Sequence, residues 1–256
     1  MIHPSAIVDP GAELGENVEI GPYSIIGAGV EIGAGCRIGP HVVIEGPTSI
    51  GRDNVIHAFA SLGGAPQDKK YAGEPTRLEI GDGNTIREYV TMNRGTTQGG
   101  GVTRVGDDNW IMAYVHIAHD CVVGDHTIFA NAASIAGHVT VDDHAILGGF
   151  VNVHQFVRIG AHSFAAMSAS ILQDVPPYVT VSGMPAGPHG INKEGLRRRG
   201  FDRETIRAIH RAYRLLYRSG LRRDEALARI SELAQGCASL RAFVRFVEGS
   251  ERGIVR

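Results

Sequence analysis

The stretch from Ile2 to Leu62 reads IHPSAIVDPGAELGENVEIGPYSIIGAGVEIGAGCRIGPHVVIEGPTSIGRDNVIHAFASL, and an aliphatic residue returns at every sixth position of it. After an interruption the same period resumes over residues 80–92, and after a second interruption it resumes over residues 105–171. A six-residue period belongs to neither a helix nor a simple strand, and a fixed internal repeat outranks local propensity. It predicts a coil of short flat strands, each sending one aliphatic side chain inward.

Three such hexads would close one triangular turn, so residues eighteen apart should stack in adjacent coils, roughly 4.8 Å apart along the axis. Each buried aliphatic side chain would then contribute roughly 1.5–3 kcal/mol to folding. Glycines directly follow many inward positions, where a tight bend would leave a side chain crowded. These are Gly15, Gly21, Gly27, Gly33, Gly39 and Gly51.

Most of the 256 residues therefore belong to one solenoid. The repeat begins at Ile2, so we expect no signal peptide, and no apolar run of about eighteen residues is present to span a membrane. The three cysteines, Cys36, Cys121 and Cys237, lack a C-x-x-C spacing. This pattern favours reduced thiols and a cytoplasmic location.

The carboxy-terminal part changes both charge and period. Residues 190–256 carry sixteen Lys and Arg against eight Asp and Glu, whereas the preceding residues carry nine against nineteen. Helices are expected from an N-cap at Asp202 to a stop at Gly220, over 224–234, and over 239–247. On the first of them five arginines recur at helical spacing: Arg203, Arg207, Arg211, Arg214 and Arg218. They form either a solvated face or a docking surface for an acidic partner; nucleic acid is disfavoured because the rest of the chain is acidic and no aromatic platform is present.

Between Ile111 and Ile171 only five residues are charged. The outward positions of this segment instead include Tyr114, Val122, Ile128 and Ile146. A free three-sided prism should be better covered by charge, so we expect some faces to pack against other copies, most simply in a homotrimer.

Histidines cluster in the same segment. His116 and His119 flank Ile117, His138 follows Ile135 and His154 follows Val153; the spacing of eighteen predicts that all four share one edge, with Asn152 and Gln155 nearby. Histidine there could bind a metal or act as a general base. Asp120 could orient the ring of His119, and the backbone N–H of Gly137 could stabilise an oxyanion.

Six motifs carry a more specific resemblance. They are QDKKYAGEPTR (67–77), HIAHDC (116–121), AGHV (136–139), VHQF (153–156), DVPPYV (174–179) and EGLRRRGF (194–201). In this order they resemble the acyl-carrier-protein-dependent UDP-N-acetylglucosamine O-acyltransferases, across essentially the whole chain. The resemblance implies a left-handed parallel β-helix over residues 1–188, with loop insertions near 63–79 and 93–104, and a helical domain over 189–256.

It also implies an activity: transfer of a 3-hydroxyacyl chain from acyl carrier protein to the 3-hydroxyl of UDP-N-acetylglucosamine. This is the first step of lipid A biosynthesis in the cytoplasm, and it needs no cofactor and no metal. By position, His119 becomes the general base, Asp120 its orienting partner and Gly137 the oxyanion donor. The resemblance implies substrate contacts at Asp68, Lys70, His116, His138, His154, Gln155, Asn192, Glu194 and Arg198, an acyl groove between subunits, and carrier-protein docking on the arginines of the first predicted helix.

Two positions depart from the family pattern. Asn93 stands where many relatives have histidine, which bears on the contact to the nucleotide diphosphate. Met167 stands where many have glycine, and we expect it to act as a ruler that favours a ten-carbon acyl chain.

Four alternatives remain open at this point. One is the sister N-acyltransferase, which usually carries an extra amino-terminal domain that the repeat starting at Ile2 leaves no room for. Another is an acetyl-CoA-dependent acetyltransferase, which the tail disfavours. A γ-type carbonic anhydrase would use the histidines as zinc ligands, and a non-catalytic scaffold would use them only to fill an edge.

Overall fold

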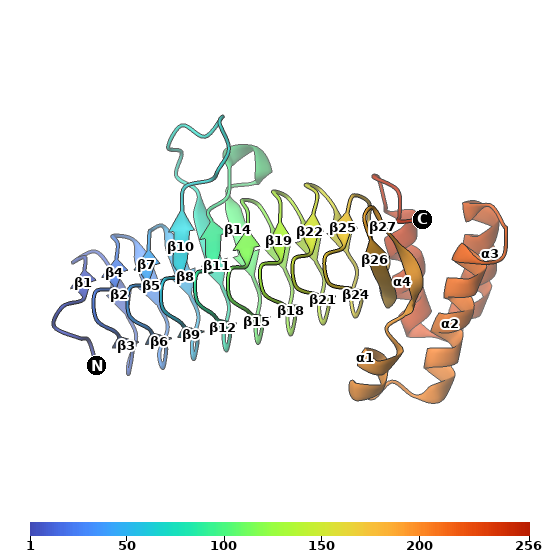
Figure 1. Ribbon diagram of the computed structural model, residues 1–256, viewed down its shortest axis with the longest axis horizontal. Coiled ribbons are helices and arrows are strands. Elements are labelled where there is room, and N and C mark those ends of the chain that lie inside the picture. The colour runs from blue at the N-terminus through green and yellow to red at the C-terminus, as the bar shows by residue number, and fades with distance from the viewer.

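A computed structural model describes residues 1–256. Three sheets, whose strands are parallel except for the last one of the third sheet, form the faces of a long triangular prism, and the helices gather at its carboxy-terminal end (Figure 1). The first sheet holds β1 (Ile7–Val8), β4 (Ile25–Ile26), β7 (Val43–Ile44), β10 (Ser61–Gly64), β13 (Thr91–Asn93), β16 (His116–Ile117), β19 (Ser134–Ile135), β22 (Asn152–Val153) and β25 (Ser170–Ile171). The second holds β2 (Glu13–Leu14), β5 (Val30–Ile32), β8 (Thr48–Ile50), β11 (Arg77–Ile80), β14 (Val102–Val105), β17 (Val122–Val123), β20 (Thr140–Val141) and β23 (Arg158–Ile159). The third holds β3 (Glu19–Ile20), β6 (Arg37–Ile38), β9 (Val55–Ile56), β12 (Thr85–Ile86), β15 (Trp110–Ile111), β18 (Ile128–Phe129), β21 (Ile146–Leu147), β24 (Phe164–Ala165), β26 (Val179–Gly183) and β27 (Ala186–Ile191).

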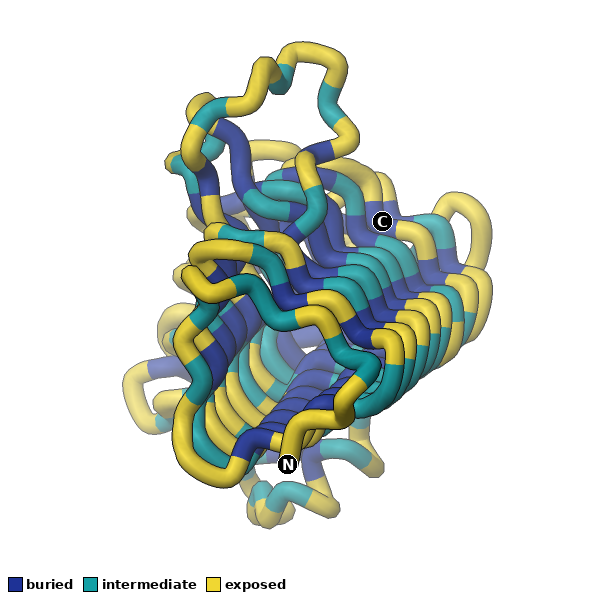
Figure 2. The backbone as a smooth tube through the Cα atoms, turned by 90° about the vertical axis from the view of Figure 1, so that its left-hand side faces the viewer, coloured by how far each residue is buried: buried dark blue, intermediate teal, exposed yellow.

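The eighteen-residue stacking is confirmed by the strand register: Ile117 pairs with Ile135, and Ile135 pairs with Val153. The predicted left-handed β-helix of hexapeptide repeats is likewise confirmed. Buried positions run in rows along the prism (Figure 2). The row of inward aliphatic side chains is incompletely buried only at its amino-terminal end, where Ile2 is 46% exposed because no further coil covers it.

From Val18 onward, each hexad buries a second position that the sequence analysis did not predict. It lies two residues before the inward side chain and, except at Leu78, is small or polar: Val18, Ser24, Cys36, Asn54, Cys121, Thr127 and Ala145 are examples. The prism interior is therefore filled by two side chains per hexad, a large one from the strand and a small one from the corner.

The crowding expected at the glycines is confirmed, but the left-handed bend of the corners does not lie at them. The left-handed backbone lies three residues after the inward position, as at Asp120 (φ 60°), His138 (φ 62°) and Phe156 (φ 65°). The glycine directly after the inward residue is needed for close approach instead: a Cβ on Gly15 would lie 2.6 Å from the backbone N of Ala34 in the next coil.

We call the corners that lead from the first to the second sheet the first edge, those from the second to the third sheet the second edge, and those from the third to the first sheet the third edge. Both insertions leave the first edge, between β10 and β11 and between β13 and β14 (Figure 1). The second one contains a short 3-10 helix, Thr97–Gly99. Two loops distant in sequence thus project from one side of the prism.

The carboxy-terminal helices are α1 (Lys193–Arg198), α2 (Arg203–Tyr217), α3 (Arg223–Ala234) and α4 (Ala238–Glu248). The N-cap at Asp202 is confirmed, since its Oδ1 accepts from the N–H of Thr205 at 2.7 Å. The sequence reading missed α1. The boundary expected between residues 188 and 189 falls inside β27, which pairs with β26, so we place it after Ile191. No helix has the length and apolar character that crossing a membrane requires.

Candidate active site

A cleft of about 620 Å³ opens on the first edge, between the two insertions and the corners that follow β16, β19 and β22. The insertions contribute one side and the corners the other. Its lining residues are Gln67, Asp68, Lys69, Lys70, Thr96, Gln98, His119, His138, Gln155 and Phe156.

His119 and Asp120 form a hydrogen-bonded pair in this cleft. The Nδ1 of His119 lies 2.8 Å from Oδ2 of Asp120, whose side chain is fully buried, whereas 15% of the His119 side chain is exposed. A carboxylate can only accept here, so Nδ1 carries the proton and Nε2 keeps its lone pair. The left-handed backbone at Asp120 turns its side chain back toward the neighbouring histidine.

Gly137, on the next coil, lies against the ring of His119. A Cβ built on Gly137 would be 2.5 Å from Cε1 and 2.7 Å from Nε2 of His119, so only glycine leaves room for this ring position. Its buried N–H donates to no acceptor in the chain. At the second edge the equivalent N–H groups of Asp107 and Asp125 donate to carboxylate oxygens at 2.8 and 2.9 Å, which shows that this corner geometry suits a negatively charged oxygen.

His138 completes the polar floor of the cleft. Its Nε2 lies 3.6 Å from Oδ2 of Asp120, its ring meets that of His119 edge-on at 5.2 Å, and Phe156 stacks on it at 4.4 Å. Burial lowers the pKa of His138 below its ordinary value, although the Asp120 charge opposes this. This lowering favours the neutral ring of His138, which can donate or accept a hydrogen bond.

The structure separates the other predicted site residues. Asp68, Lys70 and Gln155 line the cleft with His119 and His138, but His116 and His154 do not. His116 lies on the flat face of the first sheet, where its Nδ1 is 2.8 Å from Oγ1 of Thr91, because it precedes the inward Ile117 instead of following it. The Nδ1 of His154 lies 3.1 Å from the carbonyl oxygen of Gln155, outside the cleft.

Two further groups lie on other edges. Asn192 donates from Nδ2 to the carbonyl oxygen of His162 at the second edge and accepts from Gly195, and Glu194 and Arg198 lie exposed on the helix that follows. Met167, which is 72% exposed, follows β24 on the third edge. Met167 is therefore on a different edge from the cleft and is not among the residues that line it. Asn93 is buried and donates to the carbonyl oxygen of Ala65 at 3.0 Å, so its amide braces the first insertion.

The cleft contains residues that the sequence reading did not select: Gln67, Lys69, Thr96, Gln98 and Phe156. Gln67 and Lys69 belong to the QDKK run that was recognised. Phe156 lies eighteen residues after His138, so the repeat spacing already placed it there. Thr96 gives no such signal, because it lies inside an insertion.

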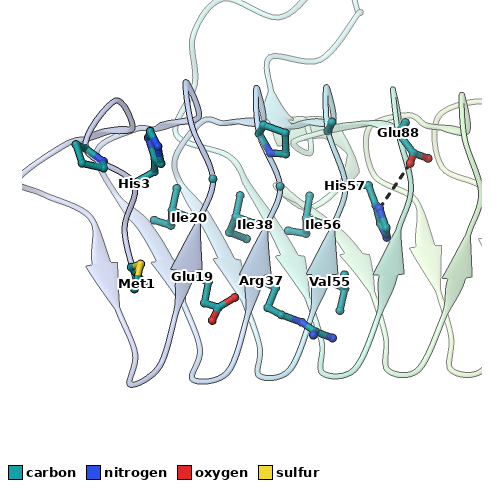
Figure 3. A pocket seen from close by; sticks show the side chains of 15 residues that line it. Met1, His3, Glu19, Ile20, Arg37, Ile38, Val55, Ile56, His57 and Glu88 are labelled. Atoms are coloured by element: carbon teal, nitrogen blue, oxygen red, sulfur yellow. Dashed lines mark ion pairs between the residues drawn. The ribbon is translucent and has the colours of Figure 1, made fainter.

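A larger hollow, about 720 Å³, lies on the third sheet near the amino terminus (Figure 3). Along it Glu19, Arg37 and Val55 occupy matching positions of β3, β6 and β9. One histidine and one carboxylate of this hollow, His57 and Glu88, lie 3.6 Å apart, and each is about one-third exposed. An exposed pair this far apart is a weak candidate for proton transfer, so the smaller cleft is the better candidate for the active site.

The set His119, Asp120 and His138 could also hold a metal ion, since the potential ligand atoms lie within 4.8 Å of one another. Asp120 Oδ2, however, already accepts from Thr96 Oγ1 at 2.7 Å and faces the Nδ1 of His119 at 2.8 Å. A metal would have to replace these hydrogen bonds, so the arrangement fits a base and its orienting carboxylate better.

Comparisons with known proteins agree with this geometry. Residues 1–34, 29–64 and 103–137 match the bacterial transferase hexapeptide model, and residues 174–255 match the second domain of UDP-N-acetylglucosamine O-acyltransferase. A protein of Halorhodospira halophila named acyl-[acyl-carrier-protein]--UDP-N-acetylglucosamine O-acyltransferase is 61% identical over 100% of this chain and 99% of its own length. A protein of the same name from Thiobacillus denitrificans is 60% identical over the same shares. The chain belongs to the UDP-N-acetylglucosamine O-acyltransferase family.

Solved structures of this family superpose closely. The Francisella novicida UDP-N-acetylglucosamine acyltransferase gives a TM-score of 0.98 at 44% identity, covering 100% of this chain and 94% of that one. The Moraxella catarrhalis O-acyltransferase gives 0.97 at 48%, covering 100% and 99%. The family resemblance and the enzyme class, an acyltransferase, are thereby confirmed. The relatives share one name over their full length, which favours O-acyl transfer over the N-acyltransferase, carbonic anhydrase and scaffold alternatives.

Proposed function

We propose that this UDP-N-acetylglucosamine O-acyltransferase moves a 3-hydroxyacyl chain from acyl carrier protein to the 3-hydroxyl of UDP-N-acetylglucosamine, with His119 as general base. In this family the reaction opens lipid A biosynthesis. One observation carries the proposal: a histidine whose Nδ1 is committed to a buried carboxylate at 2.8 Å stands in a cleft beside a free backbone N–H.

The geometry supports the following steps. His119 Nε2 removes the proton of the sugar 3-hydroxyl while its oxygen attacks the thioester carbonyl carbon. The carbonyl oxygen gains negative charge and accepts a hydrogen bond from the N–H of Gly137. The tetrahedral intermediate then expels the carrier thiolate, which takes the proton back from His119, so an ester forms, the thioester breaks, and the base is regenerated.

Substrate recognition divides between the cleft and other surfaces. Within the cleft, Lys70 offers a cation for the phosphates of the sugar nucleotide, while Asp68, His138 and Gln155 offer polar atoms for the sugar. Glu194 and Arg198 keep their proposed nucleotide contacts, which need a second copy to bring α1 near a cleft. Asn192 uses both ends of its amide within the chain, so we assign it to holding the start of α1.

We infer a homotrimer in which a neighbour completes each cleft. Large apolar side chains outside the core support it: Trp110 is 45% exposed, Tyr114 60%, Val122 41% and Phe150 59%. Such side chains on a regular prism are usually covered by another subunit. A cytoplasmic location is supported by three free cysteines, two of them buried.

Acyl carrier protein is strongly acidic in this family, and we propose that it docks on α2. Four arginines line a shallow groove of about 470 Å³ there: Arg207, Arg211, Arg214 and Arg218. They and Arg203 are exposed and take part in no ion pair within the chain. Unpaired cations on one helix face attract an acidic partner and speed its encounter.

The test is turnover of UDP-N-acetylglucosamine with 3-hydroxyacyl carrier protein. His119→Ala should lower kcat by about 10²–10⁴-fold with the fold retained. The control is His126→Ala, because His126 is a corner histidine at the second edge, outside the cleft, and lies one position further along its corner than His119 does. Near-normal turnover in His119→Ala overturns the base assignment. Acylation of an amine acceptor in place of the hydroxyl would point to the sister enzyme.

A further inference from the structure

The second insertion folds over Asp120 through Thr96, which is only 2% exposed. The Thr96 N–H donates to Oδ1 of Asp120 at 2.7 Å, and its hydroxyl donates to Oδ2 at 2.7 Å. The same hydroxyl oxygen accepts from the N–H of Gly99 at 3.2 Å. Because a carboxylate can only accept, the single hydroxyl proton of Thr96 points at Asp120, while the hydroxyl oxygen accepts from Gly99.

These bonds fix the carboxylate in the plane that His119 needs. Thr96 occupies Oδ1 with one donor and Oδ2 with another, so the carboxylate cannot rotate without losing both bonds. Gly99 adds a wall, since a Cβ there would collide with the Asp120 carboxyl group. The backbone N–H of Asp120 is held separately, by Oγ1 of Thr103 at 2.8 Å.

We propose that Thr96 is a positioning residue for catalysis, whose two hydrogen bonds hold Asp120 so that it accepts from Nδ1 of His119 and leaves Nε2 as the base. The inference rests on the proposed role of His119. The proposed catalytic unit then comprises three hydrogen-bonded residues: the adjacent pair His119 and Asp120 at a corner, and Thr96 from an insertion.

The test compares two buried threonines, Thr96 and Thr127, each of which donates from its N–H and its hydroxyl to one polar side chain, but at different edges of the prism. Thr96→Val removes the hydroxyl and keeps the N–H, whereas Thr96→Ser keeps both donors. Thr127 is the matched control: it is fully buried and its hydroxyl donates to Oδ1 of Asn109 at 2.6 Å, at the second edge. Both valine variants should lose some thermal stability, because each leaves a buried acceptor with one donor fewer.

Steady-state kinetics separate positioning from folding. Thr96→Val should lower kcat by about 10- to 100-fold with KM for the sugar nucleotide nearly unchanged, because a misoriented base is lost chiefly from the transition state. Thr96→Ser should restore kcat to within about threefold, and Thr127→Val should leave kcat unchanged. Equal kcat for Thr96→Val and the parent overturns the inference, as does an equal kcat loss in Thr127→Val.

The His119→Ala background separates this inference from the proposed function. Adding Thr96→Val to His119→Ala should cause no further loss, since residues that act as one unit are not additive. Normal turnover in His119→Ala would contradict both the role of His119 as base and the role of Thr96. An inactive His119→Ala variant beside a fully active Thr96→Val variant removes the role of Thr96 alone.

Discussion

Replacement of Gly137 by alanine tests the site with a single methyl group. Gly137 does not have a positive φ, so its backbone conformation is open to alanine. The obstacle is the His119 ring, which a Cβ would approach at 2.5 Å from Cε1 and 2.7 Å from Nε2. Ordinary contacts of this kind are about 1 Å longer, so the ring has to move by about that amount, and a displacement of about 1 Å at a reacting group costs about 10²-fold in rate.

Gly137→Ala should therefore lower kcat by about 10²-fold, while the free energy of unfolding changes by no more than about 1 kcal/mol because a flexible ring yields. Turnover with 3-hydroxyacyl carrier protein and urea unfolding measure the two quantities. Gly149→Ala is the control: Gly149 also lies two residues after an inward side chain, and its Cβ would meet only the carbonyl oxygen of Asn131 at 3.4 Å. A Gly137→Ala variant with parental kcat would refute the placement of the His119 ring in catalysis.

Three further predictions concern other parts of the chain. Reversing Arg207 and Arg211 to Glu should weaken carrier-protein binding at low salt and leave uridine nucleotide affinity unchanged; the difference should vanish near 1 M salt, where charges are screened within about 3 Å, and equal carrier affinity at low salt would contradict docking. Met167→Gly should shift acyl preference from ten carbons toward longer chains in competition between 3-hydroxydecanoyl and 3-hydroxymyristoyl carrier proteins; a parent that prefers fourteen carbons would exclude Met167 as the ruler. Burial, helped by His144 and Arg199 and opposed by Asp143, lowers the pKa of His162 to about 4. The pKa of this histidine in the unfolded chain is about 6.5. The unfolded chain therefore binds the proton more readily, so the free energy of unfolding is not reduced by this group above pH 6.5 and falls as the pH drops toward 4. His162→Phe puts at the second edge a residue that Phe156 places in the equivalent left-handed position at the first edge. It should reduce that fall when urea unfolding is compared at about pH 7 and about pH 4.5; an unchanged slope would contradict it.

The repeat determined much of the site by itself. In the uninterrupted part of the chain, eighteen residues make one coil, so residues 119, 137 and 155 had to stack on one edge. The adjacency of His119 and Asp120 needed no tertiary information either. The same spacing also places Met167. Ala165 is 48 residues after Ile117, which is not a multiple of eighteen, so Met167 falls on a different edge from His119.

The flat sheets explain why His116 does not line the cleft within one chain. A residue just before an inward side chain points outward from the strand, whereas a residue two after it lies at the corner. Both lie near Ile117 in sequence, but only the corner residue reaches the cleft. Proximity in a hexad therefore does not by itself identify a shared site.

The sequence alone determined the prism, its inward ladder, the family and the pair His119–Asp120, because all of these follow from a local period and from neighbouring residues. Only the tertiary structure decided what covers that pair. The path of an insertion is not set by the hexad period, and its contacts depend on which edge it leaves and where its backbone returns. The folded chain brings Asp68 and Lys70 from one loop into the cleft of His119, and Thr96 from the other loop onto the carboxylate of Asp120. A repeat fixes the scaffold, and the interruptions of the repeat complete the site.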